Sequence, residues 1–233
     1  MIDLSHEERR TLLALYDGLR VADVRDGLDW HMMHHYGSMS YEIRPLFRTR
    51  TCGIARTARY VAYEGPVSQM TPEQAVEWIA WYCGNVCTWP WLEELEEGDF
   101  VVIDQGGLNV GLMGSNNSLY GVKQGARGYV TNGGVRDTDE LIVQKVPFWS
   151  RMIAQGRVEG RLRYEAHDVP VSVGGALVRP GDVVVADGDG VVVVPRAVAA
   201  DVARFARGEL ERDKVGRRKL YADVGLEPDE TVR

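Results

Sequence analysis

The sequence is poor in cysteine, has no long apolar run and shows no excess of basic residues. Its three cysteines are too few, and odd in number, for a disulfide framework, which favours a reducing environment. No stretch approaches the roughly 18 to 20 consecutive apolar residues that a membrane span needs. The N-terminus has neither the basic nor the apolar region of a signal peptide. We therefore expect a cytoplasmic protein that does not enter a membrane.

The charge balance argues against nucleic acid as a partner. Lys and Arg total 27 against 34 Asp and Glu, so the formal net charge is −7. Nucleic-acid binders usually present a basic face, and the sequence has no Lys/Arg cluster of that kind. This balance still leaves room for a local basic pocket that binds a small acidic substrate.

What is present is the composition of an ordinary globular domain. The chain has 233 residues, of which 45% are hydrophobic and 26% are charged. That length gives room for a sizeable core without disulfides. We find no repeat and no linker, so we predict one α/β or α+β domain with N-terminal helices over 5–30, a core over 45–195 and a C-terminal helix over 196–221.

Capping patterns place two of the helices. Ser5 and Glu8 form a capping box, and Thr71 with Gln74 repeats that pattern before a second helix that has proline at its first position. The apolar positions of the second helix predict an inner stripe of Val76, Ile79, Ala80 and Cys83.

Short β-rich runs separated by glycine dominate the core region. Gly188-Asp189 is a turn-forming pair that predicts a tight hairpin between the last two runs. A helix over 114–125 is expected between two earlier strands. The predicted strands cover 53–62, 100–103, 128–131, 171–173, 183–186 and 191–194.

The turn that opens the helix over 114–125 is a candidate anion site. Glycines 107, 111 and 114 have the wrong spacing for a dinucleotide fingerprint. Backbone N–H groups at a glycine turn can converge on an anion, and the positive end of the following helix adds to the attraction. A purely structural turn is the alternative. The candidate anion-binding residues are Gly114, Ser115, Asn116 and Asn117.

Arg136 and Asp137 follow the apolar strand over 129–131. An Arg–Asp pair at the carboxyl end of a strand is well placed for a site in a layered α/β structure. Arg136 could hold a carboxylate with two parallel hydrogen bonds. Asp137 could ligate a hard divalent ion such as Mg²⁺. The alternative is an ordinary surface pair at a helix start, where the helix dipole favours acids.

Three other groups have weaker patterns. The three histidines between residues 31 and 35 could meet on a helix, but no Glu or Cys accompanies them in a known metal spacing, so we favour a loop or packing role. Cys83 and Cys87 share a helix face and are expected to pack there. Asp187-Gly-Asp189-Gly190 is expected to be a turn rather than a calcium loop.

The order of motifs resembles the RraA-like family, which includes class II 4-hydroxy-4-methyl-2-oxoglutarate/4-carboxy-4-hydroxy-2-oxoadipate aldolases. The resemblance covers most of the chain. The motifs that carry it begin with Gly53-Ile-Ala-Arg-Thr-Ala and Glu97-Gly-Asp-Phe-Val-Val-Ile-Asp104, continue with Gly128-Tyr-Val-Thr-Asn-Gly-Gly-Val-Arg-Asp137 and Val146-Pro-Phe-Trp-Ser-Arg, and close with the stretch from Val178 to Pro195.

The resemblance implies a fold, an activity and an assembly. The fold is an α-β-β-α sandwich resembling a swivelling phosphohistidine domain, assembled as a homotrimer or homohexamer with active sites between subunits. The aldolases use Mg²⁺ or Mn²⁺ to cleave 4-hydroxy-2-oxo dicarboxylates to pyruvate and a second oxo acid, and many also decarboxylate oxaloacetate. A small 2-oxo acid is therefore the implied substrate.

The resemblance also implies residue roles. Arg136 would bind the pyruvyl group, Asp137 would ligate the metal, and the turn over 114–117 would receive the substrate carboxylate on its amides. The family supplies a glutamate from a neighbouring subunit, for which Glu209 and Glu211 both fit, and we favour Glu211.

One departure from the aldolase pattern leaves an alternative function open. The aldolases carry an aspartate twenty residues before the Arg–Asp pair, where this chain has Ser115. The namesake of the family is a non-catalytic regulator that binds an RNA-degrading enzyme and lacks the intact pair. Retention of Arg136 and Asp137 favours a lyase over such a regulatory protein-binding member, and Ser115 weakens that preference.

Overall fold

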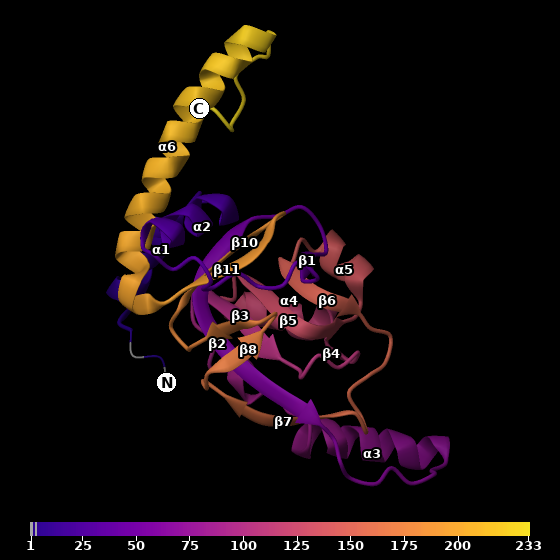
Figure 1. Cartoon of the computed structure of the whole chain (residues 1–233). Helices are drawn as coiled ribbons and strands as arrows, with labels where there is room; N and C mark the ends of the chain where they lie inside the picture. Colours follow the sequence, from indigo (N-terminus) through magenta and orange to yellow (C-terminus); the bar gives the residue numbers. More distant parts are fainter. Residues whose placement is uncertain (1, 3) are drawn as a thin grey trace.

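The computed structural model describes residues 2 and 4–233, and a nine-stranded mixed sheet forms its centre (Figure 1). The main strand order is β1-β6-β5-β3-β2-β10-β11, with β4 added beside β5 and β7 beside β2. A separate pair, β8 and β9, forms a small antiparallel hairpin. The strands are β1 (Arg44–Pro45), β2 (Thr51–Ala62), β3 (Asp99–Asp104), β4 (Gly111–Met113), β5 (Gly128–Val135), β6 (Phe148–Ile153), β7 (Leu162–His167), β8 (Val171–Val173), β9 (Ala176–Val178), β10 (Val183–Asp187) and β11 (Gly190–Val194).

Parallel pairing in the middle of the sheet brings several strand ends to one edge. Strand β2 runs parallel to β3, β3 to β5, and β5 to both β4 and β6. The carboxyl ends of these strands therefore lie on the same side of the molecule. The outer strands β1, β7 and β10 pair antiparallel with their neighbours.

The helices lie at the ends of the chain and between the strands. Figure 1 shows α1 and α2 beside the first part of α6, and the rest of α6 extending away from the body. The helices are α1 (His6–Tyr16), α2 (Val21–Trp30), α3 (Pro72–Asn85), α4 (Ser115–Gln124), α5 (Thr138–Val143) and α6 (Ala199–Val224), with 3-10 turns η1 (Pro90–Leu92) and η2 (Arg196–Val198). Within the described part of the chain, no helix has both the length and the apolar character that crossing a membrane requires.

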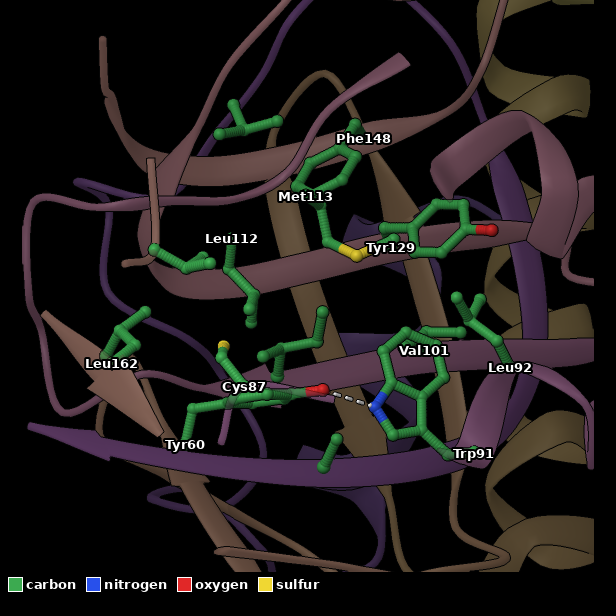
Figure 2. Packing of buried hydrophobic residues seen from close by; sticks show 14 of the residues in the cluster. Tyr60, Cys87, Trp91, Leu92, Val101, Leu112, Met113, Tyr129, Phe148 and Leu162 are labelled. Carbon is green, nitrogen blue, oxygen red and sulfur yellow. Dashed lines mark hydrogen bonds between the residues drawn. The ribbon is translucent and has the colours of Figure 1, made fainter. Parts of the chain in front are cut away.

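Alternation along the strands sends side chains to different clusters of buried residues. On β3, Val101 and Ile103 join a cluster that packs against η1 and α4, while Phe100 and Val102 join a cluster on the opposite face. Figure 2 shows the first of these clusters, where the indole N–H of Trp91 donates to the Tyr60 hydroxyl at 2.9 Å. This two-residue period is the strand pattern that the sequence carries.

The same alternation on β10 links the sheet to the terminal helices. Val183 and Val185 pack against α1, α2 and the first half of α6, whereas Val184 and Ala186 face the cluster that β3 also reaches. The two halves of the sheet therefore share one interior cluster, which the β8–β9 hairpin adjoins, and the helices cover the outer faces. The prediction of a single mixed α/β domain is confirmed.

Several local predictions are confirmed by the structure. Both capping boxes are present, at Ser5 and at Thr71. The helix after the glycine turn begins at Ser115 and ends at Gln124, and the Gly188-Asp189 pair closes the β10–β11 hairpin. The C-terminal helix is present and extends three residues past Tyr221.

The predicted inner stripe of α3 is wrong in part. Val76 is 68% exposed and Ala80 is also exposed, whereas Tyr82 is fully buried and Trp78 packs against its ring. Val76 and Trp78 are two residues apart, which is about 200° around a helix. Because the large aromatic rings of Trp78 and Tyr82 occupy the contact with the body, the smaller aliphatic residues face outward.

Candidate active site

Arg136 and Asp137 line a pocket at the edge where the parallel strands end. Strand β5 stops at Val135, and the two residues follow immediately. Beside them lies a pocket of about 250 Å³. The wall that holds the pair also includes Gly111, Leu112, Gly114, Asn116 and Asn117. The structure thus brings the Arg–Asp pair and the first turn of α4 to one cavity.

The side chains of the pair bind each other and remain partly open. Arg136 Nε donates to Asp137 Oδ1 at 3.0 Å, and the two side chains are 34% and 33% exposed. This is the only hydrogen bond of the Arg136 guanidinium to any residue that the structure describes, so both Nη groups remain available to a ligand. Asp137 has a φ of 54°, in the left-handed region that few residues other than glycine adopt.

Asp137 is held as a carboxylate by its neighbours. Partial burial by itself would raise the pKa of Asp137, but hydrogen bonds from the Arg136 side chain and the Ser115 backbone outweigh it, so the pKa is lowered. Ser115 donates its backbone N–H to Asp137 Oδ2 at 3.1 Å, and its hydroxyl lies 3.4 Å from the same oxygen. The charge of Asp137 therefore persists to a lower pH than that of an ordinary aspartate.

The contact between Ser115 and Asp137 changes the interpretation of the glycine turn. We expected the amides of 114–117 to receive a substrate carboxylate, but the Ser115 amide already binds the protein's own Asp137. Ser115 does not line the pocket, whereas Asn116 and Asn117 do. Amides in the first turn of a helix have no acceptor within the helix, so those of Asn116 and Asn117 are the remaining anion-binding groups of the turn.

Gly111 in β4 and Gly114 before α4 make room for the pair. A Cβ on Gly111 would lie 2.8 Å from Arg136 Cδ, and a Cβ on Gly114 would overlap Asp137 Oδ2. Figure 2 shows Leu112 and Met113, which lie between these glycines, packed in the aromatic cluster of the core. The glycine spacing that does not fit a nucleotide fingerprint is therefore explained by the close approach of the Arg–Asp side chains.

The rest of the pocket lining was not predicted. It is formed by Cys83 and Trp89 together with Arg157, Val158 and Glu159 from the turn between β6 and β7. Cys83 was expected only to pack within its helix, yet its Sγ lies 3.5 Å from Glu159 Oε1, and partial burial raises the pKa of its thiol. The Arg157–Glu159 stretch shows no motif, and only the return of the chain after β6 brings it to the cavity.

The glutamates of α6 do not line this pocket. Glu209 contacts Trp30 Nε1 and Arg212 of its own chain. Glu211 is more exposed, at 58%, and lies 3.5 Å from Lys214. The role of Glu211 toward a neighbouring subunit stays a prediction.

The other candidate residues make contacts within the fold and do not line the pocket. His34 Nδ1 lies 3.2 Å from Asp29, and none of the three histidines between 31 and 35 belongs to a group with metal-ligand geometry among the described residues. Cys87 is buried in the aromatic core, where burial raises the pKa of its thiol.

One group with metal-ligand geometry was missed by sequence reasoning. Ligand atoms of Glu94, His167 and Asp168 lie within 4.8 Å of one another, so this group could hold a metal ion. Arg56 Nη1 lies 2.8 Å from Asp168 Oδ2 and already balances part of its charge. None of these residues lines the pocket beside Arg136. Glu94 is far in sequence from the adjacent residues His167 and Asp168, and the three have no recognisable metal-ligand spacing.

Comparison with known proteins identifies a family and several relatives. A family model described as RraA-like, Aldolase/RraA, matches residues 20–193. A protein of Deinococcus radiodurans named "Putative 4-hydroxy-4-methyl-2-oxoglutarate aldolase" is 42% identical over 99 residues, which is 42% of this chain and 61% of that protein. The chain thus matches about three fifths of the length of this curated relative.

Solved structures extend the similarity to nearly the whole chain. The Streptomyces coelicolor protein RraAS2, described as an unusual member of the RNase ES inhibitor RraA protein family, has a TM-score of 0.73 and 26% identity over 90% of this chain and 98% of that chain. The RNA-processing inhibitor RraA from Thermus thermophilis has a TM-score of 0.51 and 26% identity over 72% of this chain and 92% of that chain.

Proposed function

The chain belongs to the RraA-like family, and we propose that it is a divalent-metal-dependent carbon–carbon lyase. Its substrate would be a 4-hydroxy-2-oxo acid that is cleaved to pyruvate and a second oxo acid, and oxaloacetate decarboxylation would be a second activity of the same site. The observation that supports this most is the shared pocket of Arg136, Asp137 and the first turn of α4. The name of the Deinococcus relative points to the same reaction class.

Arg136 is suited to bind and stabilise the reacting part of such a substrate. Cleavage leaves negative charge on the oxygen of the pyruvate enolate. The guanidinium has only Nε engaged, so its Nη groups can donate to the 2-oxo and carboxylate oxygens. A donor that is fixed before the reaction stabilises developing charge more than solvent does, since it needs no reorganisation.

The residues on the same wall fit a hard divalent ion. Asp137 offers a carboxylate that stays ionised, and Asn116 and Asn117 offer amide oxygens beside it. Mg²⁺ binds through one or two carboxylates and retains most of its waters, so this small donor set suits it, and Mn²⁺ prefers similar ligands. The bound ion would supply Lewis-acid polarisation of the substrate's 2-oxo group.

The assembly and the fold likeness are parts of the same proposal. A homotrimer or homohexamer would bring Glu211 of one subunit toward the pocket of another, and the fold would be an α-β-β-α sandwich like that of a swivelling phosphohistidine domain. The exposed position of Glu211 on α6 is compatible with this role.

Pyruvate release tests the proposal directly. The purified chain is mixed with 4-hydroxy-4-methyl-2-oxoglutarate or oxaloacetate, with and without Mg²⁺, and pyruvate is measured with coupled lactate dehydrogenase. We expect pyruvate from both substrates and a loss of activity after metal chelation. No pyruvate from either substrate under any metal condition would reject the lyase.

A non-catalytic regulator is the second candidate function. The supporting observation is the similarity to the Streptomyces protein, which spans 90% of this chain. Inhibition of a purified RNA-degrading enzyme by this chain, together with no pyruvate release, would favour the regulator.

A further inference from the structure

The pocket lining includes a second arginine–carboxylate pair besides Arg136 and Asp137. Arg157 Nη2 lies 2.6 Å from Glu159 Oε1, and the Glu159 side chain is only 7% exposed while that of Arg157 is 52% exposed. Both residues line the cavity. The cavity therefore has two carboxylates, Asp137 and Glu159, from different segments of the chain.

A hydrogen bond joins the segment that carries Glu159 to strand β4, which lies against Arg136. The backbone N–H of Gly111 donates to the carbonyl oxygen of Gly156 at 2.9 Å, directly before the Arg157–Glu159 segment. Gly111 in turn lies against the Arg136 side chain, since a Cβ there would be 2.8 Å from Arg136 Cδ. Gly111 therefore contacts both the segment that carries Glu159 and the side chain of Arg136, whose guanidinium would bind the pyruvyl group.

The turn that carries Glu159 is well ordered by its own contacts. Val158 is 4% exposed, and its carbonyl oxygen accepts hydrogen bonds from the backbone N–H groups of Arg161 and Leu162. Arg161 Nη1 also donates to the carbonyl oxygens of Arg157 and Glu159. A group held in this way loses little conformational freedom when a substrate binds.

The Glu159 carboxylate keeps one oxygen available. Arg157 and Cys83 both contact Oε1. Oε2 accepts no hydrogen bond from any described residue. Asp137, by contrast, has Oδ1 bound by Arg136 and Oδ2 bound by Ser115. Of the two pocket carboxylates, Glu159 is the one with an oxygen free to take a proton.

We propose that Glu159 is the general base that accepts the proton of the substrate's C4 hydroxyl during cleavage. This inference rests on the proposed lyase function. The O–H bond breaks toward Glu159 Oε2, and the C4–O bond becomes a carbonyl as the C3–C4 bond breaks. The bonding pair of electrons forms the pyruvate enolate beside Arg136. C3 then takes up a proton from solvent to give pyruvate, and Glu159 releases the proton it accepted to solvent. Atoms and charge balance without an oxidant or reductant.

Decarboxylation of oxaloacetate has a different requirement. Its C–C bond breaks with loss of CO₂, and there is no C4 hydroxyl from which a proton must be removed. Enolate stabilisation by Arg136 is needed in both reactions, but a base at Glu159 is needed only for aldol cleavage. The two substrates therefore separate the role of Glu159 from that of Arg136.

The test compares Glu159→Gln with the wild-type chain on both substrates. We expect kcat for 4-hydroxy-4-methyl-2-oxoglutarate cleavage to fall by about 10² to 10⁴-fold, the usual contribution of general base catalysis, while kcat for oxaloacetate decarboxylation stays within about threefold. Glu159→Asp keeps the carboxylate and should retain more cleavage activity than Glu159→Gln. Glu165→Gln is the matched control, because Glu165 lies on β7 outside the pocket and pairs with Arg59 and Arg163.

Three outcomes would overturn the inference. Unchanged cleavage in Glu159→Gln would place the base elsewhere. Equal losses of cleavage and decarboxylation at an unchanged melting temperature would assign Glu159 to general electrostatics or positioning. A wild-type chain that decarboxylates oxaloacetate and cleaves no 4-hydroxy-2-oxo acid would remove the step that needs a base, whereas a chain inactive on both substrates would reject the lyase function itself.

Discussion

Two arginine–aspartate clusters lie at opposite ends of the parallel strands, and they differ in how many of their hydrogen-bonding groups are open to a ligand. Asp99 is at the start of β3, and Arg136 and Asp137 follow the end of β5, which runs parallel to β3. The side chains of Asp99 and Arg56 are 0% and 3% exposed, whereas those of Arg136 and Asp137 are 34% and 33% exposed.

The buried cluster has most of its hydrogen-bonding capacity used within the protein, although Arg9 Nε has no hydrogen-bond partner among the described residues. Arg56 Nε donates to Asp99, Nη1 to Asp168 and Nη2 to the carbonyl oxygen of Glu94. Asp99 also accepts from Arg9 and from the backbone of Glu96. The contacts among Arg9, Arg56 and Asp99 therefore stabilise the fold.

The pocket pair is incomplete in the folded chain. Arg136 keeps both Nη groups free, and its aspartate lies beside open amides of α4. An Arg–Asp pair with unused donors next to a cavity therefore indicates function, whereas a fully buried pair whose donors are mostly engaged indicates stability. In parallel sheets, ligands bind beyond the carboxyl ends of the strands, which is the end where the incomplete pair lies.

The largest expected effect is on stability, at the buried cluster. Asp99→Ala leaves Arg9 and Arg56 buried without their shared carboxylate, which should cost about 3 to 5 kcal/mol of unfolding free energy. Chemical denaturation followed by circular dichroism measures this. Asp201→Ala, at an exposed ion pair of α6, is the control and should cost less than about 1 kcal/mol. A mild effect of Asp99→Ala would mean that the two clusters are energetically alike.

Arg136→Ala should show the opposite profile. We expect pyruvate release to fall by about 10² to 10³-fold on both substrates, equivalent to about 2.7 to 4 kcal/mol of transition-state stabilisation, with little change in melting temperature. Coupled lactate dehydrogenase kinetics provide the measurement. Arg151→Ala, which removes an exposed arginine paired with Glu42 outside the pocket, should keep wild-type rates. Near-normal activity of Arg136→Ala would remove this residue from the mechanism.

Gly114→Ala should disturb the Arg136–Asp137 pair by steric overlap alone. Its new Cβ would overlap Asp137 Oδ2 and push the carboxylate away from Ser115 and Arg136. We expect about a tenfold or greater loss of pyruvate release, which corresponds to about 1.4 kcal/mol or more, and a weaker response to Mg²⁺. Gly216→Ala, a helical glycine with open space around its Cβ position, should leave activity unchanged. Equal activities of the two variants would show that the close approach at Gly114 is not needed.

The smallest expected effect is a difference in pH dependence between wild type and Asp137→Asn. Because the folded pKa of Asp137 is lowered, its contribution to stability is complete above the unfolded pKa of about 3.9 and is lost as pH falls through the folded value. The difference in unfolding free energy between the two proteins should thus be constant from pH 7 to about pH 5 and shrink only near and below pH 4. A difference that already disappears near pH 6 would contradict the lowered pKa.

The sequence predicted the local features of the fold well. The capping residues Ser5 and Thr71 and the turn at Gly188-Asp189 act within a few residues of chain, so their side chains or backbone preferences decide the outcome locally. The stripe of α3 was predicted less well, because the competition between Val76 and Trp78 for the contact with the body depends on the surface that receives the helix.

The candidate site likewise contains residues that the sequence identified and residues that only the structure revealed. Arg136, Asp137 and the glycine turn were identified from sequence, because each contains a recognisable local pattern at the end of a strand or the start of a helix. The Ser115–Asp137 contact, the Arg157–Glu159 wall and the Glu94–His167–Asp168 group join residues that are 22 or more positions apart or lie in segments without motifs. No short-range pattern encodes those distances.

The amino-acid order alone indicated the capped helices, the hairpin at Gly188-Asp189 and the candidate pair Arg136 and Asp137, but it did not indicate strands β1, β4, β6, β7 and β9. Strand pairing decided the rest: parallel alignment of β3, β5 and β6 brought the loop after β6 against Gly111 and gave the cavity its second carboxylate. The physical reason is the distance along the chain over which each interaction acts. Backbone preferences and capping act over one or two turns of chain, whereas the surroundings of a charged group depend on every segment that folding packs around it.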